Sequence, residues 1–284
     1  MKNALTIDVE DWYQTLDFDL DIKCWPKYED RIANNTNRIL DLLSKFDVKA
    51  TFFVLGCVAE SHPELVREIN QCGHEIGSHG GWHRLVKRQT REEFRKDVIY
   101  SKVVLENIIG KPVSLYRASS WSISSDTLWA LEILEEEGFK CDSSIQPFKT
   151  PLSGMSGVPD TPFHPVIGDK QLKILEFPST VLQLGNLHIP FSGGFYLRVL
   201  PYSIISWVLR NLNRQRPGMI YVHPWETDVD QPKIQVPGHI RFTHYYKLNT
   251  TIHKLGKLLS DFDFVPLGEL IKAENYPSYF ITPN

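Results

Sequence analysis

Short runs of apolar residues alternate along the chain with segments in which apolar residues recur every three or four positions. The first pattern is typical of strands buried on both faces, and the second predicts amphipathic helices. Strands are predicted at residues 5–7, 50–55, 73–77 and 219–222, and helices at 34–46, 63–70, 92–109, 125–137, 202–212 and 250–262. This alternation favours an α/β fold in which helices cover a parallel sheet.

Residues 147–195 interrupt the alternation. They are rich in Pro, Gly, Ser and Thr and hold only short apolar runs, so we expect loops and β-hairpins inserted into the sheet domain. A chain of 284 residues allows one α/β barrel of ~250 residues or two domains. Because the candidate site residues described below run from Asp8 to His223, we predict a single domain over residues 1–284.

Charge and composition narrow the class of protein. The formal net charge is −3, from 31 Lys and Arg against 34 Asp and Glu, which argues against a strongly basic nucleic-acid binder. The N-terminus has no apolar run of signal-peptide length, and residues 195–209 are too interrupted to span a membrane. The four cysteines form no CxxC pair. We therefore expect a cytoplasmic protein. Residues 195–209 are interpreted as a buried helix, with peripheral membrane contact as the alternative.

Two groups of polar residues follow the first and third predicted strands, where the loops of a parallel barrel carry catalytic side chains. Asp8, Glu10 and Asp11 form an acidic run, which taken alone also suits a solvated turn. His79 and His83 are four residues apart and follow a strand and two glycines, so one metal ion is able to bind both rings. The alternative is an accidental spacing among ten histidines.

Three further residues qualify by their position. His223 ends the strand predicted at 219–222, Arg117 follows a short strand, and Asp142 follows Gly138 and Phe139. One carboxylate and two histidines make a metal site with an open position, while a second carboxylate and a separate histidine supply a base and an acid. This set suits the hydrolysis of an amide or ester, although two histidines and one carboxylate also describe iron(II) oxygenases.

The ordered motifs resemble the polysaccharide deacetylases of the NodB-homology type, carbohydrate esterase family 4. The matching segments are ATFFVLG at residues 50–56, GHEIGSH at 73–79 with His83, Tyr116-Arg117 and His223. The start at residues 8–12 and the segment around Asp142 are most similar to a branch associated with bacterial exopolysaccharide and surface-glycan loci.

This resemblance implies a distorted, incomplete (β/α) barrel of seven strands, with a β-rich insertion and a C-terminal extension at residues 239–284 packed on the barrel. It also implies metal-dependent removal of an N-acetyl group from an amino sugar. The residues that match the family's functional positions are Asp8 as the base, His79 and His83 as metal ligands, Arg117 as the residue that orients the base, His223 as the general acid, and Asp142 as the carboxylate that tunes this acid.

The third metal ligand departs from the family pattern, because Val9 separates the two carboxylates that most members have side by side. The ligand is therefore Glu10 or Asp11, and Glu10 is favoured. The resemblance implies a divalent metal, zinc first, with cobalt, nickel, iron and manganese as alternatives. A few relatives open cyclic amides without metal, but the intact His79 and His83 argue against that reaction here.

Four aromatic residues near the motifs are candidate sugar contacts: Trp82, Trp121, Tyr196 and Trp225. Their alternative role is core packing, since Trp and Tyr are usually part-buried. We predict a deacetylase acting on a polysaccharide or on its nucleotide- or lipid-linked precursor. The alternatives are an N-deformylase, a cyclic-amide hydrolase, and a catalytically inactive glycan-binding homologue.

Overall fold

The computed structural model describes residues 1–150, 153–185, 187–273 and 275–281. The chain divides into two compact units. The first unit comprises Met1–Phe52, Cys72–Glu75 and Pro190–Leu270, and the second comprises Phe53–Gln71, Ile76–Ile189 and Ile271–Asn284. A few positions of the predicted insertion and extension lie outside the described residues, namely 151, 152, 186, 274 and 282–284.

Strand β1, Asn3–Val9, is the central strand of the first unit, and all seven of its residues are buried. It pairs in parallel with β11, Met219–Val222, and with β12, Phe264–Val265. The register pairs Ile7 with Val222. The next residue on each strand, Asp8 and His223, therefore emerges at the same edge of the sheet.

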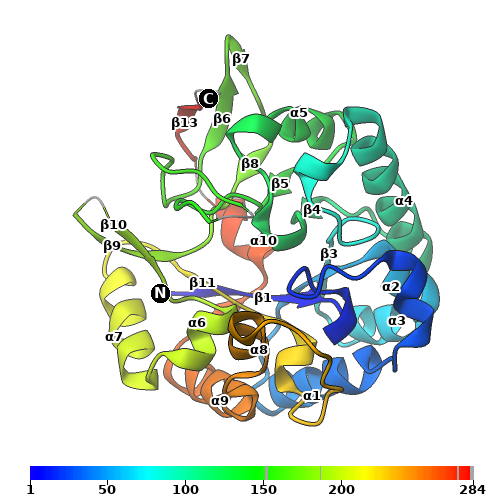
Figure 1. Ribbon diagram of the computed structural model, residues 1–284. Coiled ribbons are helices and arrows are strands. Elements are labelled where there is room, and N and C mark those ends of the chain that lie inside the picture. The colour runs from blue at the N-terminus through cyan, green and yellow to red at the C-terminus, as the bar shows by residue number, and fades with distance from the viewer. Residues whose placement is uncertain (151–152, 186, 274, 282–284) are drawn as a thin grey trace. The chain divides into compact units, whose positions relative to one another are not determined.

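The helices of the first unit lie beside these strands, and α9 lies between α1 and α7 (Figure 1). The α-helices are α1 Ile32–Lys45, α6 Gly194–Val199, α7 Tyr202–Leu212, α8 Gly238–Tyr245, α9 Thr251–Asp261 and α10 Leu267–Leu270. The 3-10 helices are η1 Trp12–Gln14, η2 Ile22–Lys27, η6 Pro224–Thr227 and η7 Leu248–Thr250. The apolar spacing predicted α1, α7 and α9 to within two residues.

In the second unit four short strands pair in parallel in the order β3, β4, β5, β8. Their bounds are β3 Glu75–Ser78, β4 Leu115–Tyr116, β5 Cys141–Asp142 and β8 Leu175–Glu176. The covering helices are α2 Gly56–Ser61, α3 Pro63–Gln71, α4 Arg91–Ile109 and α5 Trp129–Glu136, with η3 Val86–Arg88, η4 Ser119–Trp121, η5 Ser125–Thr127 and η8 Ile271–Ala273. Helix α4 contacts α2, α3 and α5.

Two smaller sheets are built from strands between β5 and α6 in the sequence, together with one strand near residue 280. One joins β6, His164–Ile167, to β7, Lys170–Gln171, and to β13, Ser278–Ile281. The other is the hairpin of β9, Val181–Leu184, and β10, Leu187–Pro190. Residues 147–195 thus contain hairpins as predicted.

The hydrogen-bonded order of the main sheet is β11-β1-β2-β3-β4-β5-β8, where β2 is Thr51–Val54, and β12 also pairs with β1. The predicted incomplete barrel of parallel strands is confirmed. The order also corrects two details of the prediction. Strand β8 lies inside the predicted insertion and β12 inside the predicted extension, yet both belong to the main sheet. Two-residue strands carry too short an apolar signal to be separated from a loop.

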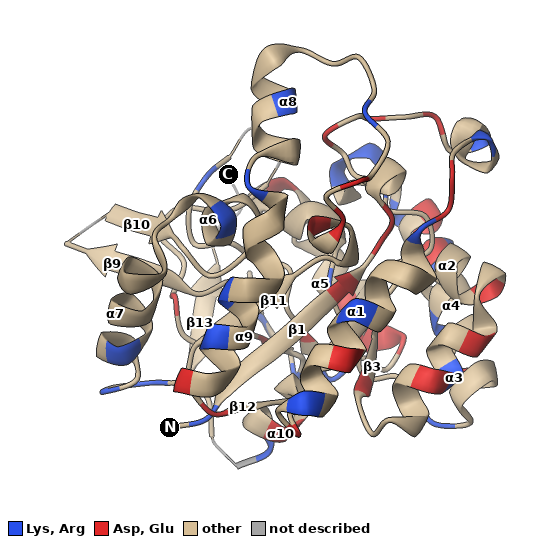
Figure 2. Ribbon diagram, turned by 90° about the horizontal axis from the view of Figure 1, so that it is seen from below, with Lys and Arg blue, Asp and Glu red and all other residues tan. Residues whose placement is uncertain are grey.

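Positive and negative residues are mixed along the helices. Figure 2 shows both signs on α1, α3 and α4, which agrees with the small net charge. Within the described part of the chain, no helix combines the length and the apolar character that crossing a membrane requires.

The first unit offers a test of its packing at Gly193, which forms a β-bridge to Tyr221 of β11. A Cβ added at Gly193 would lie 2.4 Å from the main-chain oxygen of Tyr221, so the strand would have to move. We expect Gly193→Ala to lower the free energy of unfolding by about 1–3 kcal/mol. Urea denaturation measures this change.

The matched control is Gly256→Ala in α9, where the nearest atom to an added Cβ is a Leu42 side-chain carbon at 3.7 Å. Here the better helix propensity of alanine should raise the free energy of unfolding by up to about 1 kcal/mol. Equal effects at Gly193 and Gly256 would contradict the close approach to β11.

Candidate active site

The carboxyl edge of β1 and β11 brings three predicted site residues together in the first unit. His223 Nε2 lies 3.9 Å from Asp8 Oδ2 and 3.8 Å from Glu10 Oε1. Asp8 and Glu10 are 2% and 3% exposed, so their charges interact across a medium of low polarity. Val9 is buried between them. Side chains alternate along an extended chain, which sets Asp8 and Glu10 on the same side.

Asp11 has a different role in the structure. Its Oδ1 accepts a hydrogen bond from the main-chain N–H of Trp12 at 2.8 Å, and its Oδ2 accepts one from that of Arg31 at 2.7 Å. Burial raises the pKa of Asp11 to about 7, although these two hydrogen bonds act to lower it. Because backbone groups engage both of its oxygens, Asp11 acts as the cap of η1, and Glu10 is the better-placed candidate ligand.

His223 is held by a carboxylate that the sequence analysis did not assign. Glu226 Oε2 accepts from the main-chain N–H of His223 at 3.0 Å and lies 2.8 Å from its Nδ1. Burial alone would lower the pKa of His223, but the charge and hydrogen bond of Glu226, together with the charges of Glu10 and Asp8, raise this pKa to about 9. His223 is therefore protonated at neutral pH, with Nε2 directed at the two carboxylates.

Glu226 is itself fully buried, and Arg198 supplies its counter-charge. Arg198 Nε donates to Glu226 Oε1 at 2.7 Å. Its Nη atoms donate to the carbonyl oxygens of Thr243, His244 and Tyr246 at the end of α8. Burial alone would raise the pKa of Glu226, but the charges of His223 and Arg198 lower it. The only sequence signal for Glu226 is its position three residues after His223, across the turn that begins at Pro224.

In the second unit, His79 has the surroundings of a metal ligand. Its Nδ1 lies 2.8 Å from the main-chain oxygen of Arg117. An Nδ1–H donated to this carbonyl directs the lone pair outward on Nε2, an arrangement common among metal-binding histidines. The rings of His79 and His83 are 5.3 Å apart, and both residues are buried. His83 has a φ of +49°, a backbone conformation that costs a non-glycine residue energy and is often found at functional sites.

The loop between these histidines is anchored on Asp97 of α4, a residue that the sequence analysis missed. Asp97 Oδ2 accepts from the main-chain N–H of Gly81 at 2.6 Å, and burial raises the pKa of Asp97. A Cβ at Gly81 would lie 2.7 Å from Asp97 Oδ1, so the close approach requires glycine. Asp97 lies between Phe94 and Val98 on the buried face of α4. A carboxylate on this apolar helix face was the sequence feature that could have identified Asp97 as a site residue.

Arg117 is fully buried between two aromatic rings. Its guanidinium carbon is 4.3 Å from the ring centre of Phe53 and 4.2 Å from that of Trp121. Its Nε and Nη2 donate to the main-chain and side-chain oxygens of Ser143 at 3.2 and 3.0 Å. These contacts fix the guanidinium plane. Trp121, a predicted sugar contact, is only 4% exposed because its ring packs on Arg117.

Asp142 faces Glu176 across the paired strands β5 and β8. The two carboxyl groups are fully buried and hydrogen-bonded to each other, and each has one oxygen without another partner, Asp142 Oδ2 and Glu176 Oε2. Burial raises the pKa of Asp142 to about 6 and that of Glu176 well above its usual value. A proton held by Glu176 and donated to Asp142 keeps one of the two buried carboxyl groups neutral. The position on the His223 ring predicted for Asp142 is held within the first unit by Glu226.

The predicted sugar contacts differ in exposure. Trp225 is 5% exposed, stacks on His223 and His244, and donates through Nε1 to Glu10 at 3.1 Å. Trp225 therefore packs against the candidate acid His223, and its ring faces are not open to a sugar. Trp82 is half-buried and stacks on Tyr100, with ring centres 5.8 Å apart. Tyr196, 37% exposed, is the most accessible of the four.

Two family models match the chain. Polysaccharide deacetylase matches residues 18–139, and a domain of unknown function, DUF3473, matches residues 143–272. The chain carries a polysaccharide deacetylase domain. His79, His83 and Arg117 lie within this deacetylase domain, whereas His223 lies within the second match.

Known relatives of the deacetylase domain carry related names. A peptidoglycan-N-acetylglucosamine deacetylase of Bacillus cereus is 36% identical over 98 residues, which cover 34% of this chain and 36% of that protein. A peptidoglycan deacetylase of Helicobacter pylori is 29% identical over 137 residues, which cover 48% of this chain and 42% of that protein. The chain thus matches less than half the length of each of these relatives.

Solved structures share the fold of the deacetylase domain and its continuation. A candidate polysaccharide deacetylase from Mycobacterium smegmatis superposes with a TM-score of 0.65 at 20% identity, covering 100% of this chain and 94% of that one. A pseudoenzyme of the CE4 family from Bacillus anthracis gives a TM-score of 0.52 at 15% identity, covering 98% and 66%. These similarities support the incomplete barrel.

The pairing of His223 with Glu226 is testable by titration of the metal-free protein. A pKa of about 9 means that the protonated ring stabilises the fold below the usual pKa of ~6.5, and that this stabilisation is lost as pH rises through about 9. We expect Glu226→Gln to lower the pKa of His223 by at least one unit, since the nearest negative charge is removed. Imidazole NMR signals followed against pH measure this shift. Glu269→Gln, at an exposed glutamate, should leave it unchanged.

The proton shared by Asp142 and Glu176 gives a second test. A carboxyl that stays protonated when folded but ionises when unfolded makes the protein less stable as pH rises above ~4.3. Glu176→Gln keeps an acceptor for the N–H of Ile145 and supplies a permanent donor to Asp142. We expect its free energy of unfolding, relative to wild type, to increase between pH 4.5 and 7.5.

Glu176→Leu is the contrasting variant. It leaves the Asp142 carboxylate buried without its donor and should cost about 2–4 kcal/mol at pH 7.5. Urea denaturation at both pH values compares the two variants. Equal losses in the Gln and Leu variants would exclude a shared proton.

Proposed function

We propose that the chain is a metal-dependent N-deacetylase that hydrolyses the N-acetyl group of an amino sugar, in a polysaccharide or in its nucleotide- or lipid-linked precursor. The observation that carries this proposal is the position of His223, which Glu226 holds beside the Asp8 carboxylate. An amide needs a base to activate water and an acid to protonate the departing nitrogen, and this pair supplies both.

The candidate metal ligands are Glu10, His79 and His83. One carboxylate and two imidazoles are a donor set that suits zinc and also cobalt, nickel, iron or manganese, and we propose zinc first. The hydrogen bond of His79 Nδ1 to a main-chain carbonyl supports the assignment, because it leaves Nε2 for a metal. Glu10, His79 and His83 would hold a divalent ion, which would supply acidification of water and polarisation of the acetamide carbonyl.

The residues of the chain then divide the proton transfers. Asp8 takes a proton from the attacking water while the new C–O bond forms. His223 Nε2 gives its proton to the sugar nitrogen as the C–N bond breaks, releasing acetate and a free amine. Glu226 holds the ring through Nδ1 and stabilises its protonated form before transfer. The role of Arg117 in orienting Asp8 and the tuning role of Asp142 stay predictions.

The choice of an N-acetylated sugar is supported by the relatives from Bacillus cereus and Helicobacter pylori, which are named as peptidoglycan deacetylases. The small net charge fits a neutral substrate better than a polyanion. The cytoplasmic location, and with it a precursor rather than a finished polymer as substrate, stays a prediction, as does peripheral membrane contact.

The test combines metal content with acetate release. Protein stripped of metal and reloaded separately with each of the five metals is assayed on oligomers of N-acetylglucosamine. We expect Asp8→Asn to reduce kcat by roughly 10²–10⁴-fold, the usual contribution of a general base. His79→Ala and His83→Ala should lose bound metal, measured by elemental analysis. Asp41→Asn and His239→Ala, at exposed positions, are matched controls expected to retain both properties.

The outcomes separate the alternatives. Release of formate from N-formyl sugars without release of acetate would move the assignment to a deformylase, and turnover of cyclic amides by metal-free protein would indicate that class. Sugar binding without hydrolysis under any metal would indicate an inactive glycan-binding homologue.

A further inference from the structure

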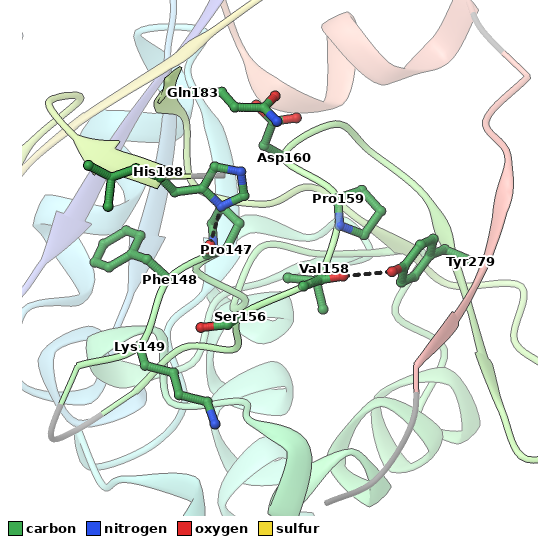
Figure 3. Close-up of a pocket in the computed structure, with 12 residues that line it drawn as sticks. Pro147, Phe148, Lys149, Ser156, Val158, Pro159, Asp160, Gln183, His188 and Tyr279 are labelled. Atoms are coloured by element: carbon green, nitrogen blue, oxygen red, sulfur yellow. Dashed lines mark hydrogen bonds between the residues drawn. The ribbon is translucent and has the colours of Figure 1, made fainter. Parts of the chain in front are cut away.

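A cavity of about 730 Å³ lies in the second unit, and none of its lining residues is assigned to catalysis. Its walls are residues 147–149, residues 156–160, the β9–β10 hairpin and Tyr279 of β13 (Figure 3). We propose that this cavity is a second sugar-binding site, which holds a neutral sugar unit of an oligosaccharide substrate. The choice of ligand rests on the proposed function.

The cavity has apolar and polar walls of the kind that a sugar ring needs. Phe148, Val158 and Pro159 provide apolar surface for the C–H face of a ring. Asp160 and Gln183 extend from different segments and supply polar groups to the lining (Figure 3). Their oxygen and amide groups accept from and donate to hydroxyl groups, which themselves both donate and accept.

Hydrogen bonds hold the walls in place before any ligand binds. His188 on β10 is hydrogen-bonded through Nδ1 to the main-chain oxygen of Pro147, so the hairpin is tied to the opposite wall. With Nδ1 as the donor, Nε2 is an acceptor. Tyr279 donates its hydroxyl to the main-chain oxygen of Gly157 at 2.6 Å. A cavity that is formed in advance loses less conformational entropy when a ligand binds.

The charge of the lining favours a neutral ligand. Lys149 and Asp160 are the only charged residues among the lining residues described, and their charges cancel. A phosphate or polyanion would meet the Asp160 carboxylate, and an acyl chain would form no hydrogen bonds with the polar groups of Asp160 and Gln183. A sugar satisfies both walls.

The cavity is connected to the candidate active site through residues 143–147. Arg117 donates to Ser143, the main-chain N–H of Ile145 donates to Glu176, and that of Met155 donates to the oxygen of Gln146. The first wall begins at the next residue, Pro147. A sugar held by this wall is thus bound to a segment that continues, four residues earlier, to Ser143, the hydrogen-bond partner of Arg117.

The test measures binding alone, so that it is independent of hydrolysis. Metal-free Asp8→Asn protein is titrated calorimetrically with the β-1,4-linked tetramer of N-acetylglucosamine. We expect Phe148→Ala and Gln183→Ala each to weaken binding at least tenfold, because they remove a face and an edge of the cavity. Asp160→Asn keeps the volume of the side chain and should weaken binding as well, which guards against misfolding of the alanine variants. Leu184→Ala, at an exposed neighbour of Gln183 outside the lining, is the matched control and should bind as the parent protein does.

Equal affinity of the parent protein and all three cavity variants would overturn the proposal, and so would the absence of any binding by the parent protein. Failure of the deacetylase assignment gives a different result. In that case no acetate is released by the metal-loaded protein, while binding of the tetramer still depends on Phe148, Asp160 and Gln183.

Discussion

The first unit depends on the way in which one buried carboxylate, Glu226, is compensated. A charge at 0% exposure is tolerated only where it is paired and hydrogen-bonded, and Glu226 has Arg198 on one oxygen and His223 on the other. Arg198 in turn binds the carbonyl oxygens at the end of α8. Lys254 of α9 donates to the carbonyl oxygens of Leu197, Arg198 and Leu200 at the end of α6. The protonation of the candidate acid is thus linked to the packing of three helices.

In the second unit, the buried carboxyl groups of Asp142 and Glu176 are stabilised in a different way from Glu226. Asp142 and Glu176 are hydrogen-bonded to each other, and a proton held by the pair reduces two buried charges to one. Arg117 lies nearby, but it donates hydrogen bonds to Ser143, and its guanidinium group stacks on the rings of Phe53 and Trp121. Burial raises the pKa of Asp142 and of Glu176. At Glu226 the charges of His223 and Arg198 outweigh burial and lower the pKa. The two arrangements show why burial alone does not decide the charge of a carboxylate.

The sequence predicted the features that depend on local pattern. Strand β11 is a continuous apolar run, and helices α3 and α7 have strong apolar periodicity, so the sequence predicted the bounds of all three to within one residue. The strand-end positions of Asp8 and His223 follow from the parallel order of the strands. The residues that it missed act through distant partners. Arg198 meets Glu226 across 28 residues of sequence and Asp97 meets Gly81 across 16. Nothing in a single sequence pairs such residues. Trp225 was misread as a sugar contact because its two faces are covered only in the folded chain.

The pairing of β1 also sets conditions on how this chain is made. Strand β1 is synthesised long before two of its partners, β11 and β12, which begin at residues 219 and 264, whereas β2 begins at residue 51. At a synthesis rate of ~5–20 residues per second, this fully buried strand waits on the order of ten seconds or more for β11 and β12. Contacts so distant in sequence slow folding and leave an apolar edge exposed meanwhile. The strand that carries the proposed base is therefore the segment for which a chaperone has the longest opportunity to bind the nascent chain.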